Sequence, residues 1–439
     1  MRRAVVAAVV AIAVLAPAAP ASGAAPGGTC PPSPFTQELA DELARRFPGR
    51  RFSAAVLDLR DGCEHHLHPG QRMTTASVFK VEVLAGVLLR AQDEGRGMTP
   101  YEASRVRPMI RESANPPTNE LFSYLGGVAG VNALHRRLGL AETTTPTGTW
   151  GLTSTTARDQ LVLLRHLFLP GGPFTDASKA TALDELASVV PPQRWGITEG
   201  VPAGWPVALK NGFAGSPSNG WRLNSVGKVG DAWLVATFTD GWPSEAAGIV
   251  GNRYLNRAIS TRLARVPTAG FPSAEAFVAR QHLDVLSRPA DLDGLLTHTA
   301  AVHQGVDPAA LVVWLMASPE HAPRDLVARF YLAGLGRDPD LAGWDHWTRV
   351  LAHGTATPLQ VADAIASSAE GAGRTTGEAL LRRARDPGYV AQTRARVDAL
   401  VVVRALLQRP LRPDERPADV DRVSLVRWVL GSADYAARR

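Results

Sequence analysis

Lysine and cysteine are the residue types that this 439-residue chain has least of. Four lysines occur among its 47 basic residues, which leaves 43 arginines. Arginine keeps its charge in proteins, whereas a buried lysine can lose its proton. A lysine retained in such a sequence therefore points to a position at which arginine would not serve.

The sequence contains two cysteines, Cys30 and Cys63. In an exported chain an even pair indicates one disulfide, here between the N-terminal tail and the first hairpin. A free reactive thiol would need a catalytic partner pattern, and the sequence offers none. We therefore expect the disulfide.

Long apolar runs and blocks of basic residues are also absent. No segment after the N-terminus has eighteen successive apolar residues, which excludes a membrane-spanning helix in the mature chain. The net charge of +6 comes from scattered arginines without a nucleic-acid motif. A solvated basic surface is therefore preferred to nucleic-acid binding.

The N-terminus has the pattern of a secretory signal. Residues 1–25 combine two arginines, an apolar stretch and a small-residue cleavage site, and residues 26–36 form a linker rich in proline and glycine. The residues before Cys30 do not match a lipid-attachment box. We therefore expect a secreted, soluble protein, with association with the cell wall as a further option.

Residues 37–265 predict one α+β unit with an antiparallel five-stranded sheet flanked by helices. Two stretches read as strands on either side of the turn signal Asp61-Gly62, and three more extended stretches follow a helical block. The expected strands are 52–60, 63–68, 206–213, 221–229 and 232–240, with helices from Ser77 to near Gly95, within 99–165 and over 245–265.

The return strand of the first hairpin contains Glu64, His66 and His68, which alternation places on one face. These residues could bind zinc. No second ligand pair with the spacing of a structural zinc site accompanies them. An exposed strand is the preferred interpretation, and we expect no metal.

A linker over 266–275 leads to an all-α repeat domain over 276–439. Residues 287–295 correspond to 336–344 at an offset of 49, and residues 314–320 correspond to 428–434. A third, more diverged copy is expected over 400–439. Repeats of this length stack helical units that bury one another's apolar faces.

Tryptophans and paired aspartates recur in these repeats. The tryptophans could line a glycan or protein site, but packing in the core is preferred because amphipathic helices bury such residues. The aspartate pairs lack the remaining ligands of a calcium loop, so turn and cap roles are preferred. The residues are Trp314, Trp344, Trp347, Trp428, Asp291, Asp293, Asp338 and Asp340.

Two of the four lysines lie in motifs with catalytic potential. Ser77 and Lys80 are three residues apart at a helix start, so the amine can reach the hydroxyl and remove its proton. Ser113-Ala114-Asn115 follows in a loop, and Lys210-Asn211-Gly212 lies on a strand. Singly, each motif could be an ordinary helix start or turn.

The three motifs in this order resemble the S-x-x-K, S-D-N and K-T-G set of class A β-lactamases and penicillin-binding proteins. The resemblance covers about residues 37–265. It implies that Ser77 is a nucleophile forming an acyl-enzyme, that Lys80 is its base and that Ser113 relays a proton to the leaving nitrogen. A desolvated Lys80 beside a cationic Lys210 would have a lowered pKa.

The resemblance also implies a substrate-binding set around Lys210-Asn211-Gly212. Asn115 would hold the amide of the substrate, and Lys210 with Asn211 would hold its carboxylate. The backbone N–H groups of Ser77 and Phe213 would form the oxyanion hole.

Three departures from the resembled pattern matter. Ala114 replaces aspartate, and Asn211 replaces threonine or serine, although its amide could still donate to a carboxylate. The largest departure lies in residues 139–159, which contain no E-x-x-L-N motif and carry Trp150 instead. General-base help is worth about 10²–10⁴-fold, so deacylation should be slow.

We therefore expect an exported serine hydrolase acylated at Ser77 by β-lactams or D-Ala-D-Ala-like amides. The alternatives are a D,D-peptidase-like enzyme, a non-hydrolytic sensor or cell-wall-binding protein, and an active β-lactamase. No cofactor is expected. The partners are a small-molecule β-lactam or peptidoglycan-peptide substrate and a cell-wall or protein partner of the repeats.

Overall fold

The computed structural model describes residues 30–216, 220–412, 415 and 420–439. The predicted secretory signal and residues 26–29 of the predicted linker lie outside the described residues. No helix in the described part of the chain is both long enough and apolar enough to cross a bilayer.

The predicted five-stranded antiparallel sheet is confirmed. Its spatial order is β2-β1-β7-β6-β5, so the strands before and after the helical block pair through β1 and β7. β5 lies at an edge of the sheet. The strands are β1 (Arg51–Asp58), β2 (Glu64–Leu67), β5 (Val207–Ser216), β6 (Gly220–Val229) and β7 (Trp233–Trp242).

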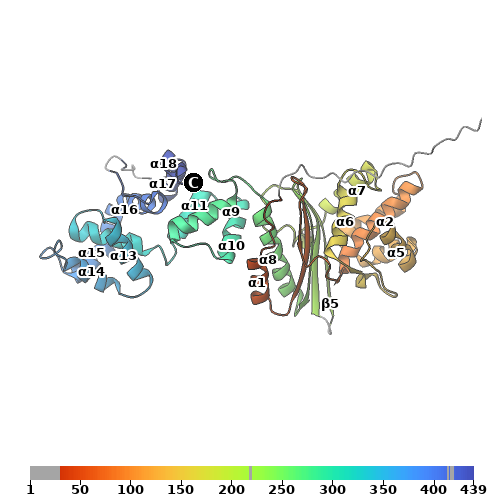
Figure 1. Cartoon of the computed structure of the whole chain (residues 1–439), viewed down its shortest axis with the longest axis horizontal. Coiled ribbons are helices and arrows are strands. Elements are labelled where there is room, and N and C mark those ends of the chain that lie inside the picture. The colour runs from red at the N-terminus through yellow and green to blue at the C-terminus, as the bar shows by residue number, and fades with distance from the viewer. Residues whose placement is uncertain (1–29, 217–219, 413–414, 416–419) are drawn as a thin grey trace, which may run out of the picture.

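Helices cover both faces of this sheet (Figure 1). This arrangement explains why β1 and β7 are buried along nearly their whole length and have almost continuous apolar sequences. One face carries α1 (Gln37–Arg46) and α8 (Glu245–Leu263); the other carries α2 (Phe79–Asp93), α6 (Ala157–Phe168) and α7 (Asp176–Ala187), with α3 (Pro100–Arg111), α4 (Asn115–Tyr124) and α5 (Gly127–Arg137) packed near α2.

α2 is the central helix of this second layer. Its residues from Phe79 to Leu89 are all buried, including Lys80 and Glu82. A helix buried all round belongs to the interior of a domain. Short elements accompany it: η1 (Ala76–Val78), η2 (Trp150–Leu152), η3 (Pro191–Gln193) and a two-stranded ribbon of β3 (Met73–Thr74) and β4 (Ser154–Thr155).

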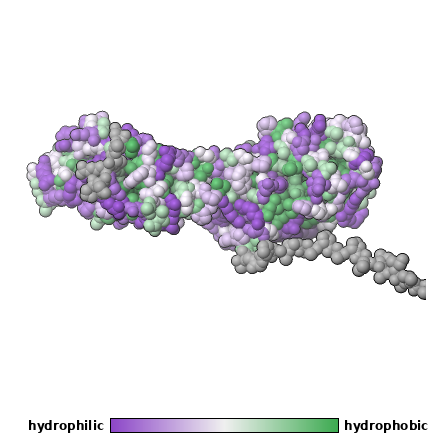
Figure 2. Space-filling model, turned by 90° about the horizontal axis from the view of Figure 1, so that it is seen from above, coloured by the Kyte–Doolittle hydropathy of each residue, from purple (hydrophilic) through white to green (hydrophobic). Residues whose placement is uncertain are grey.

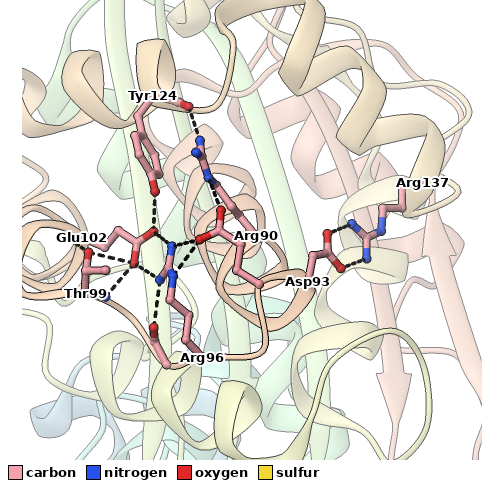
Figure 3. A network of polar contacts seen from close by, with 9 residues as sticks. Arg90, Asp93, Arg96, Thr99, Glu102, Tyr124 and Arg137 are labelled. Atoms are coloured by element: carbon pink, nitrogen blue, oxygen red, sulfur yellow. Dashed lines mark hydrogen bonds and ion pairs between the residues drawn. The ribbon is translucent and has the colours of Figure 1, made fainter.

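A polar network ties the end of α2 to α3 and α4 (Figure 3). The buried carboxylate of Glu102 accepts hydrogen bonds from Arg96, from the Thr99 backbone N–H and, at 2.8 Å, from the Tyr124 hydroxyl. Burial alone would raise the pKa of Glu102, but these hydrogen bonds lower it to about 2. The network fixes both helices that flank the loop at Ser113.

The first hairpin differs from its predicted extent at one end. β2 ends at Leu67, and His68 has a left-handed φ of 43° with its Nδ1 2.9 Å from the Phe52 carbonyl oxygen. His66 instead lies 3.3 Å from Glu64. Cys63 precedes this strand and forms a disulfide with Cys30, whose Cα is 5.8 Å away.

The C-terminal region is helical, as predicted. Two repeats each run from a π-helical turn through a 12-residue helix to a nine-residue helix. Asp291 and Asp340 cap the 12-residue helices, which confirms their predicted cap role. The elements are α9 (Ala274–Gln281), η4 (His282–Leu286), α10 (Leu292–His303), α11 (Pro308–Met316), α12 (Pro323–Phe330), η5 (Tyr331–Leu335), α13 (Leu341–Ala352), α14 (Pro358–Ala366), α15 (Gly377–Arg385), α16 (Pro387–Leu407), α17 (Arg422–Leu430) and α18 (Ala433–Ala436).

An arginine–carboxylate pair recurs in all three copies, and it supports the diverged third one. Each arginine follows a residue with positive φ and donates to an acid 25 to 33 residues further along the chain, at 2.7–2.8 Å. The pairs are Arg288–Glu320, Arg337–Glu370 and Arg409–Asp434.

Two apolar cores underlie the two lobes that the space-filling view shows joined by a narrower middle (Figure 2). The predicted linker at 266–275 does not divide them cleanly. Leu292 and Leu296 of α10 pack into the N-terminal core, and Ala203 N donates to His303 O at 2.7 Å. The first repeat therefore docks on the α8 side of the sheet, away from α2 (Figure 1).

The prediction that the repeat tryptophans pack in the core is wrong for two of them. Trp344 is 2% exposed, but Trp314 and Trp428 are 58% and 55% exposed. Their helices bury other apolar residues and need only one covered face, so the tryptophans are left outside.

Candidate active site

Ser77 lies in the 3₁₀ turn η1, two residues before α2 begins at Phe79. Ala76, immediately before it, has a φ of 47°, a left-handed conformation that costs a non-glycine residue about 1–2 kcal/mol. Such strain persists where the surroundings impose it and is concentrated at functional sites. The turn directs the Ser77 hydroxyl to the Lys80 amine, at an Oγ–Nζ distance of 2.9 Å.

The loop between α3 and α4 completes the surroundings of this amine. Lys80 Nζ lies 3.0 Å from Ser113 Oγ, 2.6 Å from Ser113 O and 2.9 Å from Asn115 Oδ1. Ser113 also has a left-handed φ, of 62°. Ala114, in place of an aspartate, caps α4 without a side-chain hydrogen bond, and Thr118 donates to its carbonyl at 2.7 Å.

Lys210 reaches the same serine from the edge strand β5. Its Nζ donates to Ser113 Oγ at 2.9 Å and to Asn211 O at 2.8 Å. The structure thus joins the predicted residues Ser77, Lys80, Ser113 and Lys210 in one hydrogen-bonded chain, although they come from three separate parts of the sequence.

Both amines are fully buried, and no carboxylate contacts either of them within the described residues. Burial lowers the pKa of Lys80 to about 7. Burial first, and then the charge of Lys80, lower the pKa of Lys210 well below its usual value. The lowered pKa that we expected at Lys80 therefore arises from desolvation. The charge repulsion between the two lysines, which we expected to lower the pKa of Lys80, lowers that of Lys210 instead.

Trp150, which lies in the loop that lacks an E-x-x-L-N motif, covers the amine of Lys80. Its ring stacks on Phe79 with centroids 5.6 Å apart, and Lys80 Nζ lies 5.2 Å from the ring centroid. Trp150 Nε1 donates to Asn119 Oδ1 at 2.8 Å, which fixes the ring. A large apolar group therefore occupies the side of Lys80 that the short loop approaches.

Gly212 allows β5 to approach the nucleophile closely. A Cβ at this position would lie 2.6 Å from Thr75 O and 3.0 Å from Ser77 N, so only glycine fits. The close packing brings the backbone at Phe213, the next residue, towards the amide of Ser77. The oxyanion hole formed by the N–H groups of Ser77 and Phe213 stays a prediction.

The expectation that Asn211 holds a carboxylate is not met. Alternation along β5 turns its side chain away from Lys210, and Asn211 is fully buried. Its Nδ2 donates to Gln193 O at 2.7 Å and to Trp195 O at 3.0 Å, which uses both amide hydrogens. Asn115, by contrast, is exposed, and its oxygen binds Lys80 as part of the site.

The strand register adds Arg222 as a candidate that the motifs did not identify. In the β5–β6 register Asn224 lies opposite Gly212, and its Nδ2 reaches Thr74 O at 2.8 Å, so that face of β6 looks towards η1. Arg222 is two residues away and faces the same side. The only signal in the sequence was a cation on the strand that follows the K-N-G strand.

Comparisons with known proteins find one family model, curated relatives and solved structures that are similar to parts of this chain. Residues 321–375 match a family described as a domain of unknown function (DUF4214). The chain is 31% identical over 202 residues to proteins named "Putative lipoprotein LppW" from Mycobacterium tuberculosis and Mycobacterium bovis. This match covers 44% of this chain and 63% of those relatives, so the chain spans less than two thirds of their length.

Among solved structures, PBP-A is 20% identical, with a TM-score of 0.47 over 54% of this chain and 100% of that chain. An ancestral class A β-lactamase is 24% identical, with a TM-score of 0.44 over 51% of this chain and 97% of that chain. Both structures are of the kind that the three motifs resemble. At this level of identity these likenesses say nothing of activity.

Proposed function

We propose that the chain is a serine acyl-transfer enzyme of the penicillin-binding type, acylated at Ser77 by β-lactams or D-Ala-D-Ala-like amides. The observation that carries this proposal is the continuous chain from Ser77 through Lys80 and Ser113 to Lys210. A lysine pKa of about 7 supplies a neutral amine at neutral pH, as a general base requires.

The first step is attack by the Ser77 oxygen on the substrate carbonyl while Lys80 Nζ accepts the hydroxyl proton. The carbonyl electrons move onto oxygen, where the N–H groups of Ser77 and Phe213 would stabilise the charge. When the C–N bond breaks, Ser113 gives its proton to the leaving nitrogen and regains one from Lys80. Lys210 holds Ser113 in place for this relay.

The substrate carboxylate would be held by hydrogen-bond donors at the β5–β6 edge. Asn211 has no amide hydrogen left for this role. Lys210 and Arg222 remain, and the planar guanidinium of Arg222 can bind a carboxylate through two hydrogen bonds. Asn115 Oδ1 is bonded to Lys80, which leaves its amide nitrogen for the carbonyl of the substrate.

Release of the acyl group is the step for which this site is poorly equipped. No carboxylate lies beside Lys80 within the described residues, and the Trp150 ring occupies that side. Loss of a general base is typically worth about 10²–10⁴-fold in rate. The slow release favours an enzyme that keeps its acyl group, either a peptidase-like enzyme or a β-lactam sensor. It argues against a resistance enzyme that hydrolyses β-lactams rapidly.

The proposal is tested with fluorescent penicillin and intact-mass analysis of the full chain. We expect one covalent adduct per chain that is absent in Ser77→Ala and persists for minutes or longer. Lack of an adduct with any β-lactam or peptide ester would favour a non-hydrolytic cell-wall-binding protein. Many turnovers per second of a chromogenic cephalosporin would identify a β-lactamase and contradict the argument from Trp150.

Export is part of the same proposal. The mycobacterial relatives are named as lipoproteins, and the motif before Cys30 differs from a lipid-attachment box. Cys30 Sγ is bonded to Cys63, so it is not free to carry a lipid. A soluble protein with an oxidised disulfide, located outside the cytoplasm, is consistent with both features.

A further inference from the structure

A cavity of about 600 Å³ lies among the repeat helices, remote from Ser77. Its volume falls in the range of about 300–1,000 Å³ that is typical of small-molecule sites. Four of its residues lie on one face of α13, at the spacing of a helix surface. The lining residues used below are Arg288, Glu320, Arg324, Asp345, Thr348 and Arg349.

Most of the charges at this cavity are already paired. Arg288 is bonded to Glu320 through two hydrogen bonds of 2.8 Å, and Arg404 is bonded to Asp345. A third acid, Asp284, also lines the cavity but is bound by arginines outside it, Arg280 at 2.9 Å and Arg438 at 3.3 Å.

Two arginines of the lining have no such partner. Neither Arg324 nor Arg349 donates a side-chain hydrogen bond or forms an ion pair with any described residue. Arg349 is exposed at the rim. Arg324 is largely enclosed, and burial lowers its pKa because the nearby Asp345 only partly offsets the desolvation.

Thr348 adds a third unused donor. Its residue is 4% exposed, and its Oγ1 has no hydrogen-bond partner within the described residues. The enclosed Nε of the half-buried Arg324 and the buried hydroxyl of Thr348 have no partner, and each destabilises the unliganded fold. Their position around one cavity suggests that they are satisfied when something else is bound.

We propose that this cavity binds a small polar molecule, or the end of a polymer, that carries an oxyanion. The unused groups are donors, and a guanidinium fork matches the planar oxygens of carboxylate or phosphate. A volume of about 600 Å³ exceeds one inorganic ion and accommodates a sugar-sized body. The ligand class is therefore a sugar or polyol that bears a phosphate or carboxylate group.

Titration calorimetry on the full chain tests this proposal with four probes: inorganic phosphate, glycerol 3-phosphate, D-galacturonate trimer and uncharged maltotriose. We expect binding of at least one anionic probe, weakened by added salt, and none of maltotriose. Preference for glycerol phosphate identifies a phosphate ligand, and preference for the uronate trimer identifies a carboxylate ligand.

Arg324→Gln and Arg349→Gln should each weaken that binding about tenfold or more, because each removes a charge-assisted hydrogen bond. Arg385→Gln, an exposed arginine outside the cavity, is the matched control and should bind normally. Arg324→Gln should also melt at a temperature no lower than the unmodified chain, since it removes an unpaired buried cation. Absence of binding by every anionic probe, or equal binding by the cavity variants and the control, would overturn the proposal.

Discussion

The rate at which Ser77 is acylated should follow the protonation of Lys80. Only the neutral amine can accept the Ser77 proton, and burial places the pKa of Lys80 at about 7. The neutral fraction is then about one tenth at pH 6, one half at pH 7 and nine tenths at pH 8. The rate should rise about tenfold from pH 6 to pH 8 and level off above pH 8.

The size of the shift makes this prediction decisive. An exposed lysine has a pKa near 10.5, which would leave a neutral fraction of only about 3 in 10,000 at pH 7. Moving the pKa to about 7 raises that fraction more than a thousandfold. The cation–π attraction of Trp150 opposes the shift, but it is worth only about 0.5–2 kcal/mol, against about 5 kcal/mol for 3.5 pKa units.

The assay is the second-order rate of labelling by fluorescent penicillin between pH 5.5 and pH 9.5, with adducts counted by mass. Lys80→Arg is the matched control because it keeps the charge and hydrogen-bonding capacity but cannot act as a base. It should show no labelling at any pH. A flat profile, a midpoint above pH 9, or labelling of Lys80→Arg would refute the assignment of Lys80 as the base.

Three further outcomes are expected. Trp150→Glu places a carboxylate beside Lys80 and should shorten the acyl-enzyme lifetime at least about tenfold, as followed by mass, whereas equal lifetimes for Trp150→Glu and Trp150→Gln would count against the explanation of slow release. Replacing Cys30 and Cys63 together by serine should lower the free energy of unfolding in urea by about 3–4 kcal/mol, because the disulfide closes a separation of 33 residues, and an unchanged midpoint would contradict this. Glu102 is ionised in the fold down to its pKa of about 2 but protonates near pH 4.5 when unfolded, so its stabilisation is present above pH 4.5 and is lost as the pH falls towards 2. Glu102→Gln should therefore be less stable at pH 7, with a shallower loss of melting temperature on acidification, and parallel curves for the two proteins would argue against the network.

Local patterns in the sequence were sufficient to predict much of the fold. Extended stretches bounded by turn signals predicted the strands that became β1, β6 and β7. The helical periodicity after Ser77 predicted α2. Asp291 and Asp340 could be recognised as caps because capping depends on a few neighbouring residues. The motif order likewise predicted the residues that meet around Lys80, since each motif is itself a local pattern.

Contacts between distant segments decided what the sequence left open. Asn211 turns to carbonyls of another loop, Trp150 covers Lys80, and Trp314 lies outside because neighbouring residues fill the core beneath its helix. The sequence by itself determined which side chains share a face of a helix or strand, because that follows from backbone geometry alone. Only the tertiary structure decided what each face meets and how far it is removed from water, and that burial sets the pKa of Lys80 on which the proposed chemistry rests.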